Sequence, residues 1–407
     1  MNPRRKDDSL ADFYEKLGVK RVINAAGTLT RLGGAPMVDE VLEAMHAAAQ
    51  WSVRMEELQE KAGAYLAEVT GAEAGYVTCG AAAGLQLAAA ACLAGLDLRK
   101  MELLPDTSNI PNEIVTQRLH RNAYDHALRA AGAKLVEVGH IGNPARGYTD
   151  PWHIEAAIHK NTVAVHWVYM DVRGAVSLED TVAVAHKHGV PVIVDAAAAL
   201  PPAANLRRLV ATGADLVSFS GGKVIGGPQA SGLLVGRRNL IDSVALQHQD
   251  MDVLPLTWTM RHKFLDSGKL PGPPLQGIGR PLKVGKEQVA GLLTALRIYV
   301  AQDHAAMRNE QIRRIKVLQE GLAGVPNVKG ELLGLEGEGY PLVRIVLDEK
   351  ALGLTAFDLV NRLFDEDPAI AVGQEGVADG YVTVNPLSLD GDKPSLIVRR
   401  IRAILSS

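Results

Sequence analysis

The sequence predicts an α/β protein in which a large domain holds a mostly parallel β-sheet between layers of helices and a small α+β domain follows. Short apolar runs alternate with helical segments over residues 103–235, a pattern typical of parallel strands covered on both faces. The 407 residues suffice for one large core and a second lobe. Only 4% of them are aromatic, so Ala, Val, Leu and Ile fill that core.

The charge balance and the termini exclude several classes of protein. Lys and Arg number 43 against 46 Asp and Glu, which argues against a protein that mainly coats nucleic acid or an anionic membrane. Met1–Asp8 is polar with no apolar stretch behind it, so no signal peptide is expected. Cys79 and Cys92 are too few for a disulfide framework or a metal-ligand cluster. We therefore expect a cytoplasmic protein with no metal site and no nucleic-acid or membrane partner.

The large domain is expected to span residues 31–285, after an N-terminal arm of residues 1–30. It opens with helices at 41–48 and 55–70, where apolar residues recur at helical spacing. The elements that follow are a strand at Tyr76–Cys79, a buried Ala-rich helix at Ala81–Leu96, strands at Leu103–Leu104, Lys134–Val138, Val163–Val168, Val190–Val194, Leu216–Ser220 and Gly232–Val235, and helices at Ala123–Ala131, Ile154–Ala157, Thr181–Gly189 and Leu206–Gly213.

The pattern changes after Asp250. Residues 255–281 hold many Pro and Gly residues and are expected to form a long ordered loop or crossover. Residues 286–407 are expected to form a linking helix, Lys286–Leu322, and the small C-terminal domain. That domain has expected strands at Pro341–Leu347, Ala369–Ala371 and Tyr381–Val384 and helices at Ala356–Phe364 and Pro394–Leu405.

Two features of the large domain point to a ligand-binding site: a turn suited to bind an anion, and a carboxylate at the end of a strand. Residues 80–84 (GAAAG) lie between a strand and a helix, where small residues let backbone N–H groups approach a phosphate at the positive end of the helix dipole. A helix that only packs tightly would also have Ala and Gly there. Asp195 directly follows the apolar strand 190–194, at the strand end where open α/β sheets bind ligands. An Asp at that position also serves as a helix N-cap.

The third feature is Lys223, which comes shortly after Ser218 and Ser220 and directly after two glycines. A lysine framed by small residues can enter a crowded pocket and form an imine, and burial would lower its pKa. Taken alone, it would be a solvated loop lysine. A phosphate cradle, a carboxylate and an imine-forming lysine in this chain order are together the requirements for holding pyridoxal phosphate. The Asp would keep the pyridine nitrogen protonated, which makes the ring an electron sink.

Further segments make the sequence similar to a known family. Residues 221–230 (GGKVIGGPQA) resemble the lysine loop of bacterial selenocysteine synthase and its relatives, which are fold-type-I pyridoxal phosphate enzymes. Residues 23–28 (INAAGT), 277–287 (GIGRPLKVGKE) and 384–386 (VNP) extend the likeness over almost the whole chain. The resemblance implies an aspartate aminotransferase-like fold with a seven-stranded type of sheet. The sequence is closer to the D-glucosaminate-6-phosphate ammonia-lyase-like branch, because only a short arm precedes the first motif and no basic surface is evident for a tRNA.

The resemblance also implies a role for each matching residue. Lys223 would form the imine with the cofactor, and Asp195 would pair with the pyridine nitrogen. Ala197 would pack beneath the ring, and one of His120, Asn122 and Tyr124 would close its upper face. The residues implied for the phosphate are Ala81 and Ala82 through their N–H groups, Ser218 and Ser220 through their hydroxyls, and Gly226 and Gly227 toward the phosphate of a neighbouring subunit, since the cofactor of this fold usually sits at a dimer interface.

An α-carboxylate is best bound by an arginine, whose guanidinium donates two parallel hydrogen bonds. Arg280 lies in a matched motif and is the first candidate, and Arg54 and Arg31 are candidates for a second anionic group. Each would otherwise be a solvated surface arginine. His166 and His262 are candidate acid–base groups, although a lone histidine is more often structural.

The resemblance finally implies a reaction. A lyase of this kind would use Lys223 to remove the α-proton, expel a β-hydroxyl, and give a 2-keto acid and ammonia from a hydroxylated amino acid such as D-glucosaminate or its 6-phosphate. The expected partners are that small molecule and at least one further copy of the chain. The alternatives are racemisation, aldol cleavage or transamination on the same cofactor, selenocysteine synthase-type transfer, and a non-enzymatic protein that binds the cofactor or a dinucleotide.

Overall fold

The computed structural model describes residues 13–142, 146–170 and 172–406, so part of the expected N-terminal arm lies outside the described residues. The chain divides into two compact units, Met37–Ala301 and Met1–Pro36 with Gln302–Ser407. These limits differ from the expected boundaries at residues 30 and 285, for two reasons. Helix α12 (Lys286–Ala301) packs on α2 (Asp39–Ala49) in the larger unit, and strand β1 (Val22–Ala25) pairs with β13 (Ala369–Val372) in the smaller one.

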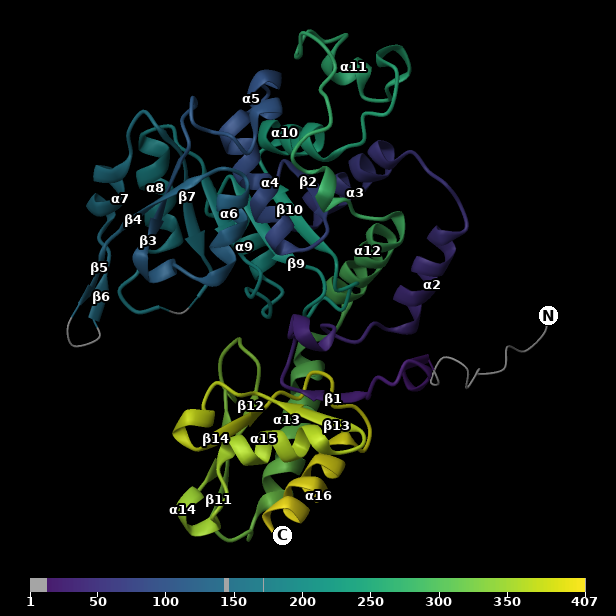
Figure 1. Ribbon diagram of the computed structural model, residues 1–407, viewed down its shortest axis with the longest axis vertical. Helices are drawn as coiled ribbons and strands as arrows, with labels where there is room; N and C mark the ends of the chain where they lie inside the picture. The colour runs from purple at the N-terminus through teal and green to yellow at the C-terminus, as the bar shows by residue number, and fades with distance from the viewer. Residues whose placement is uncertain (1–12, 143–145, 171, 407) are drawn as a thin grey trace. The chain divides into compact units, whose positions relative to one another are not determined.

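The larger unit is built on a seven-stranded sheet with the order β2-β10-β9-β8-β7-β3-β4 (Figure 1). Every pairing is parallel except those of β10, which runs antiparallel to β2 and to β9. The mostly parallel sheet expected from the sequence is confirmed. Its strands are β2 (Ala74–Thr78), β3 (Glu113–Gln117), β4 (Lys134–Val138), β7 (Thr162–Val168), β8 (Val192–Asp195), β9 (Leu216–Ser220) and β10 (Gly232–Gly236).

Side chains alternate between the two faces of this sheet, as strand geometry requires. Val194 and Val217 enter one core, and Ile193 and Leu216 enter the other. The helices of the first core are α2, α3 (Met55–Thr70), α7 (Pro151–Ala157), α8 (Leu178–Lys187), α9 (Asn205–Ala211) and α12, and those of the second are α4 (Ala81–Ala94), α5 (Leu98–Leu103), α6 (His126–Ala130), α10 (Arg238–His248) and α11 (Arg261–Phe264).

Helix α4 lies in the second core and is apolar on nearly all sides, as expected for a helix buried against a sheet. In the part of the chain that the structure describes, no helix has both the length and the apolar character needed to cross a membrane. The smaller elements of this unit include a hairpin and a short helix. They are the hairpin of β5 (His140–Gly142) and β6 (Arg146–Tyr148), and the short helix α11 (Arg261–Phe264) within the expected Pro- and Gly-rich loop.

One expected strand of this unit is wrong. Leu103–Leu104 ends helix α5, which is capped by Asp97 Oδ1 accepting a hydrogen bond from the Lys100 N–H at 3.2 Å. The strand of this region is β3, where Ile114 and Val115 are fully buried in the two cores. Strand β3 matters for the site because it pairs in parallel with β7, and the turn that follows it lies at the carboxyl edge of the sheet.

The smaller unit is an α+β domain. Its strands β11 (Val328–Leu333), β12 (Leu342–Leu347) and β14 (Tyr381–Val384) form an antiparallel sheet, and β1 pairs in parallel with β13. The expected linking helix is divided in two, because the side chain of Asp303 caps a new helix by accepting from the Ala306 N–H at 2.9 Å. The helices of this unit are α13 (His304–Leu322), α14 (Glu349–Leu352), α15 (Ala356–Asp365) and α16 (Lys393–Leu405).

Candidate active site

The carboxyl end of β8 carries Asp195, which is 7% exposed. Its register partners are Val168 of β7 and Ser218 of β9, so the carboxylate lies in the middle of the parallel strands. The Ala197 N–H donates a hydrogen bond to Asp195 Oδ1 at 3.0 Å. Burial raises the pKa of Asp195, and the nearby charge of Lys223 counteracts that effect. A buried carboxylate at this edge is suited to bind a protonated nitrogen of a ligand.

Lys223 lies in the turn after β9 and is half-buried. Burial lowers its pKa, and the charge of Asp195 opposes the shift. The turn requires glycine, because a Cβ on Gly222 would lie 2.4 Å from the Cα of Gln229. The Gly226 N–H donates to the Lys223 carbonyl at 2.9 Å, which closes the turn. The structure therefore brings together the two side chains that the sequence nominates for the chemistry.

Helix α4 begins beside the same strands. The Ser218 hydroxyl donates to the Ala81 carbonyl at 3.0 Å, and a Cβ on Gly232 would lie 2.9 Å from Ala81 N. Gly80 precedes the helix with a φ of +131°, a conformation that residues with side chains rarely adopt. The first N–H groups of a helix have no partner within it, and Ala82 in this first turn is exposed. The start of α4 thus offers backbone donors and the positive end of the helix dipole to an anion.

The other residues expected near the ring and the phosphate lie on the same edge of the sheet or in the lysine turn. Ser218 is fully buried and uses its hydroxyl proton in the bond to Ala81, whereas Ser220, the last residue of β9, is half-buried. Ala197 is half-buried two residues after Asp195. The Gly227 N–H donates to the carbonyl of Gly221 at 3.0 Å, so that donor is engaged within its own turn.

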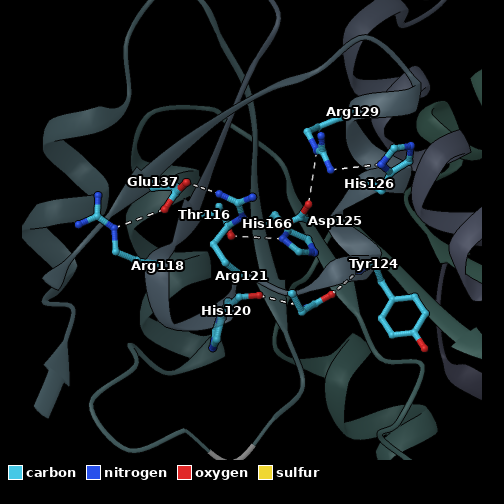
Figure 2. A network of polar contacts seen from close by, with 11 residues as sticks. Thr116, Arg118, His120, Arg121, Tyr124, Asp125, His126, Arg129, Glu137 and His166 are labelled. Atoms are coloured by element: carbon cyan, nitrogen blue, oxygen red, sulfur yellow. Dashed lines mark hydrogen bonds and ion pairs between the residues drawn. The ribbon is translucent and has the colours of Figure 1, made fainter. Parts of the chain in front are cut away.

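His120 ends η2 (Arg118–His120), which follows β3, and is fully buried (Figure 2). Its Nδ1 accepts from the Val168 N–H at 3.3 Å, and its ring packs edge-on against Trp167 with 5.3 Å between centroids. A backbone N–H can only donate, so the ring proton is on Nε2, which has no partner in the described residues. Burial lowers the pKa of His120 to about 4, so the ring is neutral near pH 7.

Asn122 lies between η2 and η3 (Ala123–Asp125), and Tyr124 lies within η3. The Asn122 amide donates to the His120 carbonyl at 3.2 Å, and its Oδ1 accepts from the Tyr124 N–H at 2.8 Å. The Tyr124 ring is 67% exposed and points away from the polar network in Figure 2. Of the three residues expected to cover the ring, His120 has no exposed face, whereas Asn122 and Tyr124 have surface available to a ligand.

The two histidines that the sequence offers as acid–base groups lie in different surroundings. His166 of β7 is 1% exposed, with its Nδ1 at 3.3 Å from the Thr116 hydroxyl oxygen. Burial lowers the pKa of His166 to about 3, so it is neutral and shielded from solvent. His262 lies in α11, where its Nδ1 donates to the Thr259 carbonyl at 3.1 Å. Both fit a structural role better than proton transfer.

The three arginines expected to bind substrate lie in three different places. Arg280 donates to the His248 carbonyl and to Asp250 Oδ2, each at 3.1 Å. It lines a cavity of about 520 Å³ whose lining includes Tyr76 and Lys283 but neither Lys223 nor Asp195. Arg54 immediately precedes helix α3 and is exposed. Arg31 belongs to the smaller unit, where its guanidinium lies over the Phe364 ring at 5.8 Å from the centroid.

An ion-pair network that was not expected from the sequence surrounds Arg121, and Figure 2 shows it beside His166 and His120. Arg121 contacts both Asp125 and Glu137. Arg121 and Asp125 are four residues apart in the sequence, so this local pair of opposite charges was the available signal. Glu137 comes from β4 and could not be assigned to the cluster from spacing.

Comparison with known proteins identifies the family. Residues 124–254 match the L-seryl-tRNA selenium transferase family. The chain is 35% identical to a 5'-C-glycyluridine monooxygenase-decarboxylase of a Streptomyces species, over 98% of this chain and 94% of that protein. It is 31% identical to the D-glucosaminate-6-phosphate ammonia lyase of Salmonella typhimurium, over 97% of this chain and 98% of that enzyme. The chain belongs to the selenocysteine synthase-like family.

Comparison with solved structures shows the fold of this selenocysteine synthase-like enzyme. A structure of D-glucosaminate-6-phosphate ammonia-lyase matches with a TM-score of 0.80 at 30% identity, covering 100% of this chain and 99% of that one. A NifS-like protein matches with a TM-score of 0.56 at 16% identity, over 95% of this chain and 99% of that one, and so shows the fold alone. The expected fold type I of pyridoxal phosphate enzymes is confirmed.

Proposed function

We propose that this enzyme is a pyridoxal phosphate-dependent ammonia-lyase that converts a hydroxylated amino acid, such as D-glucosaminate or its 6-phosphate, into a 2-keto acid and ammonia. The observation that carries the proposal is the proximity of the Lys223 amine and the buried Asp195 carboxylate at the carboxyl edge of the parallel strands. The 31% identity with an ammonia lyase over 97% of the chain supports the reaction class.

The groups at this edge fit pyridoxal phosphate chemically. The N–H groups of Ala81 and Ala82 at the start of α4 would bind the phosphate, with the Ser220 hydroxyl as a further donor. Ser218 would fix the start of α4 through its bond to Ala81. Asp195 would bind the pyridinium nitrogen, Ala197 would lie beneath the ring, and Lys223 would bind the cofactor covalently. When bound, the cofactor ring withdraws the electron pair that the α-carbon keeps after its proton leaves.

The protein side chains then divide the proton transfers between them. Lys223 Nζ, whose pKa burial lowers, would take the proton from the α-carbon of the bound substrate. In its charged form, Asp195 would favour the protonated ring nitrogen. As the β-carbon–oxygen bond breaks, the proton held on Lys223 Nζ passes to the leaving hydroxyl, which departs as water. Water then hydrolyses the released enamine to the 2-keto acid and ammonia.

A second reaction has support from sequence similarity. The 35% identity with a monooxygenase-decarboxylase covers 98% of the chain, so oxidative loss of a carboxyl group is the second candidate. A reaction of that class consumes O₂ and releases CO₂, whereas elimination consumes no O₂ and keeps every carbon. Racemisation, aldol cleavage, transamination and transfer of selenium to a seryl-tRNA are the remaining alternatives on the same cofactor.

The deciding experiment measures the visible spectrum of the purified protein before and after addition of D-glucosaminate 6-phosphate, with ammonia and O₂ followed in the same sample. We expect a cofactor band that shifts on addition, ammonia release without O₂ uptake, and loss of the band in Lys223→Ala. O₂ uptake with CO₂ release would favour the second candidate instead. A protein that gains no band when supplied with pyridoxal phosphate would refute the cofactor assignment.

We also propose an active oligomer, at least a dimer, in which the chains share their sites. Arg280 lines a cavity apart from Lys223 of its own chain, which agrees with a role at another chain's site. Exposed apolar side chains in the larger unit, including Trp51 at 76% and Leu42 at 46%, offer surface for such contacts. A cytoplasmic location accords with the free thiols of Cys79 and Cys92.

A further inference from the structure

The turn that follows β3 is fixed by ion pairs that the proposed reaction does not use (Figure 2). Arg121 Nε contacts Asp125 Oδ2 at 2.5 Å, and Arg121 Nη1 contacts Glu137 Oε1. Arg118 binds the other oxygen of Glu137 at 3.3 Å, and Arg129 lies 3.5 Å from the other oxygen of Asp125. Arg121 is thus shared by two carboxylates, one in its own turn and one on β4.

Of the two carboxylates that pair with Arg121, Asp125 depends more on the ion pair because it is buried. The Asp125 side chain is 3% exposed, whereas that of Glu137 is 35% exposed. A carboxylate in the interior needs a close cation and hydrogen bonds to remain charged. Arg129 is more distant and half-exposed, so Arg121 supplies the close contact. Because its planar fork also reaches Glu137, Arg121 joins the 121–125 turn to strand β4.

Contacts lead from this turn to the edge of the sheet at Asp195. The Asn122 amide donates to the His120 carbonyl at 3.2 Å, and the His120 ring accepts from the Val168 N–H at 3.3 Å. Val168 is the register partner of Asp195. A displacement of the turn would therefore move Asn122 and Tyr124 relative to the strand that carries the proposed cofactor partner.

We propose that Arg121 is a positioning residue for the reaction at Lys223: its ion pairs with Asp125 and Glu137 set where Asn122 and Tyr124 lie beside the cofactor. The inference rests on the proposed function, because it needs the cofactor at Asp195. In the described residues Arg121 contacts neither Lys223 nor Asp195 and acts through the turn. Arg121 would act as a residue that aligns a reacting group. Replacing such a residue lowers kcat more than it weakens binding of the substrate.

The test compares Arg121→Met with Arg237→Met as a matched control. Arg237 Nη1 binds Asp215 Oδ1 at 3.0 Å, and Asp215 is 1% exposed. Asp215 directly precedes β9 and Arg237 directly follows the antiparallel β10, so this pair lies at the opposite, amino edge of the parallel strands. Each variant leaves a buried carboxylate with its second partner, so similar falls in melting temperature are expected. In cofactor-free protein we expect faster amide hydrogen exchange over residues 118–130 in Arg121→Met alone.

With the cofactor present, Arg121→Met is expected to lower kcat about tenfold with KM little changed, and to raise the Kd for pyridoxal phosphate. Arg237→Met is expected to leave all three values near wild type. The inference is overturned if Arg121→Met keeps the wild-type kcat and Kd while melting as early as the control. If wild type binds the cofactor but releases no ammonia, the proposed function fails, and the exchange and Kd measurements still decide the role of Arg121.

A second variant covers the case in which Arg121→Met does not fold. Glu137→Gln removes the partly exposed partner and leaves the buried Asp125 pair intact. Its control is Glu155→Gln, since Glu155 is equally exposed, at 36%, and also pairs with a basic side chain, Lys187. Faster exchange over residues 118–130 and weaker cofactor binding in Glu137→Gln alone would support the inference. Identical behaviour of the two variants would overturn it.

Discussion

At the scale of single residues, burial and charge act in opposite directions on Asp195 and Lys223. Burial favours the neutral form of each, and so raises the pKa of the acid and lowers that of the base. Their mutual attraction favours the charged forms and restrains both shifts. The balance suits a site where the lysine must act as an amine while the carboxylate stays negative.

Asp195→Asn tests the role of that negative charge. The amide keeps the size of the side chain but cannot stabilise a protonated ring nitrogen, so kcat should fall by about 10²-fold or more while pyridoxal phosphate still binds. The measurement is kcat together with cofactor absorbance. The control is Asp215→Asn, a buried aspartate ion-paired to Arg237 and His186, which should cost stability and leave kcat unaffected. Equal loss of kcat in both variants would contradict the role given to Asp195.

Asp195 and Lys223 could be nominated from the sequence because Asp195 directly follows an apolar run, Lys223 directly follows two glycines, and both come after the GAAAG turn in the chain order that pyridoxal phosphate requires. The Arg121 network could not be predicted in full, since the partner on β4 becomes a neighbour only once β3 and β4 pair. The neutral protonation state of the His120 ring could not be predicted from the sequence either. Its neutrality depends on burial and on the Val168 N–H, and neither is encoded by nearby sequence.

At the scale of elements, β3 shows what a local pattern cannot supply. Only Ile114 and Val115 form its apolar centre, and the strand is stabilised by parallel neighbours on both sides, β4 and β7. Leu103–Leu104 has an equally apolar sequence, but Leu103 ends a helix that Asp97 caps and Leu104 directly follows it. Strand β8, which the sequence did predict, has a longer apolar run, Val192–Val194. Tertiary pairing therefore decides the structure of the short segments.

The buried histidines of this region predict a loss of stability in acid. Burial lowers the folded-state pKa of His120 to about 4 and of His166 to about 3, below the ordinary histidine value of 6.5. Between these values the unfolded chain binds more protons than the folded one, so stability falls as pH falls below about 6.5. The loss is on the order of 3 kcal/mol for His120 by pH 4. Denaturant unfolding of wild type and His166→Gln across this range measures it.

His166→Gln should flatten the dependence of unfolding free energy on pH, because one buried titrating group is gone. Its matched control is His262→Gln, in the loop helix α11, which should leave the slope of the wild type unchanged. A wild-type free energy that is constant from pH 6.5 to pH 4 would contradict the buried, neutral state of both rings.

At the scale of the whole molecule, the location of Arg280 bears on whether two chains share their active sites. We expect Lys223→Ala and Arg280→Met to be inactive separately. If one chain's Arg280 serves another chain's Lys223, mixed oligomers contain sites that carry neither change. Random mixing in a dimer would then recover about a quarter of the wild-type activity. The measurement is activity after the two variants are dissociated and reassembled together, and recovery no greater than the sum of the separate variants would contradict shared sites.

Strand β10 has a consequence for the order in which this protein matures. It lies between β2 and β9, so the strand before the proposed phosphate-binding turn cannot join the sheet until residues 232–236 have been synthesised. Gly232 also lies against the first residue of α4. Contacts so distant in sequence form late in folding. The yellow colour of the bound cofactor would thus report a completed large unit, and nascent chains that end before β10 should remain colourless.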